Sequence, residues 1–153
     1  MNKLELKHIA PYLPYKLKVM FPCEIETPEL NTDTLMGLEK SYDESDNWLG
    51  LFDEFETVNM DNFKPILHPL SDLKVEQDRF GNYIGKMREL SEIYWKDNMN
   101  SDLENCVNEE RFNEVIIQSP LLVSYNILLK LFEWHFDVFG LIKNGLAIDI
   151  NTI

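Results

Sequence analysis

The chain has 153 residues, a formal net charge of −13 and an isoelectric point near 4.5. This length fits a single domain over residues 1–153, and 44% hydrophobic residues supply enough apolar surface for a core. Direct binding to nucleic acid or to an anionic membrane is disfavoured, because both need clustered Lys and Arg and the lysine pairs Lys3/Lys7 and Lys16/Lys18 are sparse.

The expected compartment is the cytoplasm. The first five residues contain no apolar run, so no secretory signal is predicted. Cys23 and Cys106 lie far apart without CxxC spacing, which favours reduced thiols. The most apolar stretch, 121–142, is interrupted by charged residues and therefore favours a buried helix over a membrane span.

The first half of the chain predicts a small antiparallel sheet after a short amphipathic segment at 4–9. Three segments have the composition or alternation of strands: 15–25, 35–42 and 48–58. The polar tip 43–47 between the last two is typical of a hairpin loop. We therefore expect an acidic β-meander of about three strands over residues 15–60.

The second half, about 86–150, is predicted to be helical. Residues 63–73 contain two prolines and are expected to cross to it irregularly. The spacing of apolar residues predicts a helix over 86–96. A capping box at Ser101–Glu104 predicts another helix, from Asp102 to Phe112 or beyond.

The most apolar helix is expected to begin at Ser119-Pro120 and to run from Leu121 to Phe139. Serine is a favoured N-cap, and proline at the first helical position loses no hydrogen bond. A short strand is predicted at 146–150. The expected fold class is α+β: the meander packs on a layer of helices that includes this buried C-terminal core helix.

No catalytic motif is found, and we expect no enzyme, no cofactor and no metal. The sequence lacks a phosphate loop, a nucleophile elbow and an HExxH motif. On the predicted helix His135 and Asp137 point in different directions and cannot form a catalytic pair. His68, between Leu67 and Pro69, is expected to be structural. The oxygen-rich segment 43–47 lacks the EF-hand pattern for calcium.

The charge is concentrated in one segment, residues 24–61, which we call the acidic block. It contains twelve acidic residues and one basic residue, a charge of −11, and the rest of the chain carries −2. Such a surface can serve solubility alone. However, aromatic residues lie among the acids, and an exposed one would be a natural anchor in an interface. The predicted partner-binding residues are Glu39, Asp43, Glu44, Asp46, Trp48, Phe52, Asp53, Glu54, Phe55 and Glu56.

Three segments resemble a group of small uncharacterised phage and prophage proteins: 8–19 (HIAPYLPYKLKV), 64–73 (KPILHPLSDL) and 131–150 (LFEWHFDVFGLI and GLAIDI). The resemblance covers about a third of the chain and excludes the acidic block. It implies a protein carried on a mobile element. Small acidic proteins from such elements are often inhibitors of host defence, among which anti-CRISPR proteins are prominent.

Charge and resemblance together predict a nucleic-acid mimic that binds a basic surface of a host protein. The expected target is a CRISPR RNA-guided nuclease whose channel for guide or target would be filled by carboxylates. We take the type VI RNase as that target, a choice that no residue dictates. The alternative is a phage structural or accessory protein that forms a homo-oligomer or a virion contact.

Overall fold

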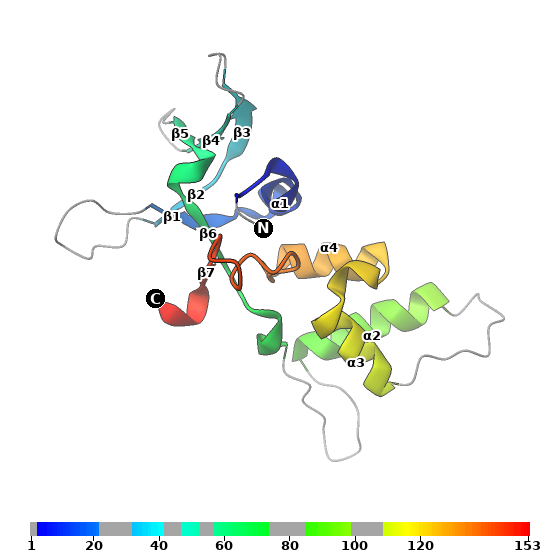
Figure 1. The fold of residues 1–153 in the computed structure, drawn as a ribbon. Helices are drawn as coiled ribbons and strands as arrows, with labels where there is room; N and C mark the ends of the chain where they lie inside the picture. Colours follow the sequence, from blue (N-terminus) through cyan, green and yellow to red (C-terminus); the bar gives the residue numbers. More distant parts are fainter. Residues whose placement is uncertain (1–2, 22–31, 42–46, 53–56, 74–84, 99–108) are drawn as a thin grey trace. The chain divides into compact units, whose positions relative to one another are not determined.

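The computed structural model describes residues 3–21, 32–41, 47–52, 57–73, 85–98 and 109–153 (Figure 1). The chain divides into two compact units. Unit 1 comprises Met1–His68 and Phe132–Ile153, and unit 2 comprises Pro69–Leu131. Helices and two sheets are present, which confirms the α+β class. The expected helical part, 86–150, is shared between the units, because its residues from Phe132 onward belong to unit 1.

The first sheet of unit 1 is formed by four short strands in the order β2-β1-β6-β7. Their bounds are β1 Lys18–Met20, β2 Thr32–Thr34, β6 Lys64–Leu67 and β7 Ile148–Asp149. β1 pairs antiparallel with β2 and β6, whereas β6 pairs parallel with β7. The sheet therefore joins the two ends of the sequence, and the predicted C-terminal strand is confirmed.

Two predictions about this sheet were wrong. The strand expected at 15–25 is not part of the meander, because β1, which falls within this range, lies between β2 and β6. Residues 64–67, expected to be irregular, form β6 despite Pro65. Proline removes one backbone donor, and this is tolerated because Pro65 pairs only with Val19 and the pairing with β7 starts at Ile66.

The second sheet of unit 1 is a three-stranded antiparallel meander in the order β3-β4-β5, as predicted. Its strands are β3 Gly37–Lys40, β4 Trp48–Leu51 and β5 Thr57–Asn59. Ser41 N donates to Asn47 O at 3.0 Å and closes the hairpin between β3 and β4. The predicted strand 48–58 is thus two strands, and the hairpin tip falls largely outside the described residues.

The core of unit 1 is built on the N-terminal segment, helix α1 (Leu6–Ile9) and the 3₁₀ helix η1 (Ala10–Tyr15). Tyr12 is fully buried; its hydroxyl donates to Phe136 O at 2.7 Å and its ring meets Phe132 edge-on. A second aromatic cluster joins Phe21, Phe52 and Phe63.

The predicted long helix 121–139 is wrong in extent. The 3₁₀ helix η5 (Pro120–Leu122) comes first, and the helix α4 spans only Tyr125–Glu133. His135 adopts a positive φ of 56°, its carbonyl accepts from His68 N, and Asp137 N donates to His68 O. These bonds to a distant segment replace the helical ones. Asp137 is buried and does not belong to a polar helix stripe.

Unit 2 contains α2 (Gly85–Asn98), α3 (Glu109–Gln118), η4 (Leu70–Asp72), η5 and most of α4. The helix predicted at 86–96 is confirmed as α2, and it lies beside α3, with the rings of Tyr94 and Phe112 4.7 Å apart (Figure 1). The capping box and the first part of the helix predicted at 102–112 lie outside the described residues. None of the helices in the described ranges is both long and apolar enough to cross a bilayer.

Candidate functional site

Three of the ten predicted partner-binding residues, Glu39, Trp48 and Phe52, fall within the described ranges. The other seven lie outside them: Asp43, Glu44, Asp46, Asp53, Glu54, Phe55 and Glu56. Phe52 is 5% exposed and packs against Phe21 and Phe63. Its side chain therefore belongs to the core, and the expectation that it could anchor a partner was wrong.

Glu39 and Trp48 lie on opposite faces of the meander. Trp48 is paired with Lys40, while Glu39 is paired with Leu49. Because neighbouring residues of a strand point to opposite faces, the structure does not bring the Glu39 carboxylate and the Trp48 indole together. Trp48 shares its face with buried Gly50 and Phe52, so it lies at the margin of the core.

The acidic block is represented in the described residues by Asp33, Glu39 and Asp61. Asp33 is exposed on β2, an edge strand of the first sheet. Asp61 is exposed on the 3₁₀ helix η3 (Met60–Asn62) and accepts an ion pair from Lys3 at 2.9 Å. Part of the block's charge is therefore neutralised by the N-terminal segment.

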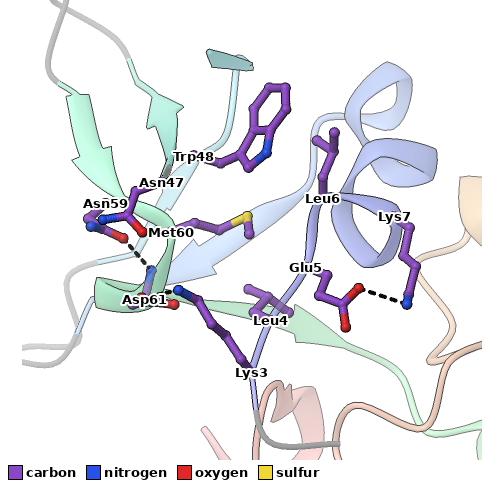
Figure 2. A pocket seen from close by; sticks show the side chains of 10 residues that line it. All are labelled: Lys3, Leu4, Glu5, Leu6, Lys7, Asn47, Trp48, Asn59, Met60 and Asp61. Atoms are coloured by element: carbon purple, nitrogen blue, oxygen red, sulfur yellow. Dashed lines mark hydrogen bonds and ion pairs between the residues drawn. The ribbon is translucent and has the colours of Figure 1, made fainter. Parts of the chain in front are cut away.

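A groove of about 450 Å³ in unit 1 contains the half-buried Trp48 (Figure 2). One wall is formed by the segment 3–7. The other is formed by the start of β4 with the preceding Asn47, the end of β5 and the helix η3. The lining residues are Lys3, Leu4, Glu5, Leu6, Lys7, Asn47, Trp48, Asn59, Met60 and Asp61. This volume is within the range of small-ligand and side-chain pockets.

The charges of this groove are paired with one another. Lys3 contacts Asp61 at 2.9 Å, and Lys7 contacts Glu5 at 2.7 Å. The hydrogen bond from Lys7, opposed by partial desolvation, lowers the pKa of Glu5. Two positive and two negative side chains thus leave the rim without net charge around an apolar centre.

A second hollow of about 350 Å³ adjoins the first. It shares Lys3, Leu4, Met60 and Asp61 with the groove. Phe63, Lys64 and Leu146 complete its lining. The two hollows meet at the Lys3–Asp61 ion pair, so the depression is elongated rather than a single closed pocket.

The buried titratable groups of unit 1 serve the fold. The Asp137 carboxylate accepts from Leu141 N at 2.7 Å and Ile142 N at 2.8 Å, and desolvation nevertheless raises its pKa. Desolvation also raises the pKa of Tyr12. No cluster of three potential metal ligands is found within the part of the chain that the structure describes.

Unit 2 carries an exposed apolar surface, which we call the 117–125 surface. Ile117, Leu121, Leu122 and Tyr125 are 38%, 57%, 78% and 70% exposed. The backbone beneath them is held by buried Ile116, Pro120 and Ile127. Contiguous exposed apolar side chains mark contact surfaces more often than single ones do, and these four lie within nine residues of the chain.

Sequence reasoning found Trp48 but missed the groove around it. One wall of the groove comes from residues 3–7, which lie more than forty positions before Trp48 in the sequence. No local sequence pattern links this segment to Trp48, Asn59 or Met60. The 117–125 surface was missed for another reason: its side chains were assigned to a buried core helix. The chain matches no protein-family model, and no curated protein or solved structure matches it significantly.

Proposed function

We propose that this protein is a non-enzymatic inhibitor that binds a nucleic-acid-handling host protein in the cytoplasm. The target class is an RNA-guided nuclease, which makes the protein an anti-CRISPR, and the type VI RNase is the specific target to test first. The resemblance of three segments to phage and prophage proteins supports the context of host defence. The partner surface is basic.

The observation that carries this proposal is the concentration of charge. A segment of about a quarter of the chain carries −11 of the total −13. Like charges so close together repel each other, so stability alone would favour interspersed lysines. Carboxylates can replace phosphates as partners of Lys and Arg in a nucleic-acid channel, and they accelerate association by electrostatic attraction.

The geometry of unit 1 supports a contact at this segment. Exposed Asp33 lies on unit 1, as does Trp48, whose indole lines an open groove. Trp is the residue type most enriched among interface anchors. Acidic residues would then attract the partner, and Trp48 would supply apolar contact.

The test is charge reversal at Asp43, Glu44 and Asp46 to Lys. A purified, guide-loaded type VI RNase is titrated with wild-type or variant protein, and RNA cleavage is measured at low and high salt. We expect inhibition by the wild type that weakens with salt, and at least a tenfold loss for the variant. Reversal of Glu76, Asp78 and Glu114, outside the block, gives the same change in net charge and should have little effect. Equal inhibition by both variants would contradict the acidic-surface mechanism.

The alternative, a phage structural or accessory protein that assembles with itself, is favoured by the 117–125 surface. Leu122 and Tyr125 are the most exposed of its large apolar side chains, and homo-oligomer interfaces are richer in apolar area than other contacts. Light scattering distinguishes the two functions. A discrete oligomer that dissociates in Leu122→Ser, with no inhibition of any nuclease, would favour assembly.

A further inference from the structure

The apolar walls of the Trp48 groove leave room for one extended segment of another chain. Leu4 and Met60 are buried beneath it, and Leu6 faces Trp48 across it (Figure 2). A ligand without apolar side chains would leave these walls in contact with water, so burial of a side chain there is favourable.

Two polar side chains of the groove, Trp48 and Asn59, present hydrogen-bond donors. Figure 2 shows the nitrogen edge of the Trp48 indole turned toward the space between Met60 and Leu6. This N–H donates to no atom of the described residues. The side-chain oxygen of Asn59 already accepts from Asp61 N at 3.0 Å, which leaves its amide N–H groups as donors. A ligand with an acceptor oxygen matches these two donors.

The charge of the groove selects a neutral ligand. Both lysines are paired with carboxylates, Lys3 with Asp61 and Lys7 with Glu5. A charged ligand group would have to compete with one of these pairs. A neutral carbonyl oxygen, in contrast, can accept from the indole without disturbing either.

We propose that this groove binds an extended, uncharged peptide segment that places one aliphatic side chain between Trp48 and Leu6 and offers a backbone carbonyl to the Trp48 indole N–H. This inference rests on the proposed function only in that the partner is a protein. The groove would then add an apolar contact to the contact that the acidic block makes with that partner.

The test uses nuclear magnetic resonance of the full chain. Its three tryptophans give three indole N–H signals, and the signal missing in Trp48→Phe belongs to Trp48. The probe is the acetylated, amidated tripeptide Ala-Leu-Ala, and Ala-Gly-Ala is its matched control. We expect Ala-Leu-Ala to shift the Trp48 signal downfield in a saturable manner and Ala-Gly-Ala to bind at least fivefold more weakly.

The Trp48→Phe variant keeps an aromatic ring in the wall and removes the N–H together with part of the indole surface. Its affinity for Ala-Leu-Ala, followed on the Met60 methyl signal, should fall about fivefold, as the loss of one neutral hydrogen bond implies. Unchanged affinity would overturn the role of the indole. Tighter binding of Ala-Lys-Ala or Ala-Asp-Ala than of Ala-Leu-Ala would overturn the selection of a neutral segment, and no saturable shift with any peptide would overturn the site.

The peptide titrations contain no nuclease, so their outcome is independent of the proposed inhibition. Peptide binding by a protein that inhibits no nuclease would retain the groove and contradict the inhibitor. If the protein binds no peptide but its inhibition of the nuclease depends on Asp43, Glu44 and Asp46, the inhibitor is retained and the groove is contradicted.

Discussion

His8 is fully buried in unit 1, beside the ring of Phe139. Its Nδ1 accepts from Glu5 N at 3.0 Å, so this nitrogen carries no proton and the neutral ring bears its hydrogen on Nε2. Nε2 is buried without an acceptor among the described residues. Protonation would therefore break the bond from Glu5 N and bring a charge into the core.

The consequence is a stability that depends on pH. Desolvation, assisted by Lys7 and opposed by Glu5, lowers the pKa of His8 below its ordinary value. Because the unfolded chain then binds the proton more tightly, the stability contributed by neutral His8 is fully present above about pH 6.5 and falls as the pH decreases. We expect the free energy of unfolding in urea to decrease between pH 7.5 and 5.5.

The variant His8→Gln isolates this effect, since it stays neutral while His68 and His135 are retained. Its free energy of unfolding will be lower at pH 7.5 but should change less between the two pH values. An equal pH dependence in both proteins would show that His8 does not titrate in this way.

At the scale of elements, the packing between the meander and the core depends on Gly50 in β4. A Cβ atom at this position would lie 2.7 Å from Phe63 and 2.9 Å from Leu35. Neither side chain can move easily because both are almost fully buried. We expect Gly50→Ala to lower the free energy of unfolding by about 1–3 kcal/mol.

Gly37→Ala in β3 is the matched control. Its Cβ would meet only Leu51, at 3.3 Å, and that side chain is half-buried and can adjust. Denaturation in urea should rank the variants wild type, Gly37→Ala and Gly50→Ala in decreasing stability. A Gly50→Ala protein as stable as Gly37→Ala would contradict this packing.

Elements with a strong local pattern could be predicted from the sequence, and those set by distant contacts could not. The apolar spacing of Met87 and Leu90 suffices for α2, because both side chains form its buried face. The helix predicted to continue to Phe139 ends early because the backbone around His135 bonds to His68, a contact between residues 67 positions apart. The division of the strands between two sheets is likewise a property of pairing, not of local composition.

The candidate site shows the same limit. The alternation along β4 places Trp48, Gly50 and Phe52 on one face, and buried Gly50 identifies that face as the core side. The sequence alone offered Trp48 and Phe52 as equal anchors. Only the folded chain brings Leu4 and Met60 to Trp48 and distinguishes the two aromatic residues.

At the scale of the whole molecule, the buried core and the proposed contact surfaces lie in different regions of the chain. His8, Tyr12 and Asp137 are buried in unit 1, and we propose that the acidic block and the Trp48 groove contact a partner. Unit 2 adds the 117–125 surface. We propose that the charge of the acidic block selects a basic, nucleic-acid-handling partner.

Capture from host lysate tests this claim most directly. Immobilised wild-type protein and the Asp43, Glu44 and Asp46 reversal variant are compared at low and high salt, and retained proteins are identified by mass spectrometry. We predict that the wild type retains a nucleic-acid-binding protein at low salt, releases it with salt or added RNA, and that the variant does not retain it. Retention of the same proteins by both, or of none by the wild type, would contradict the claim.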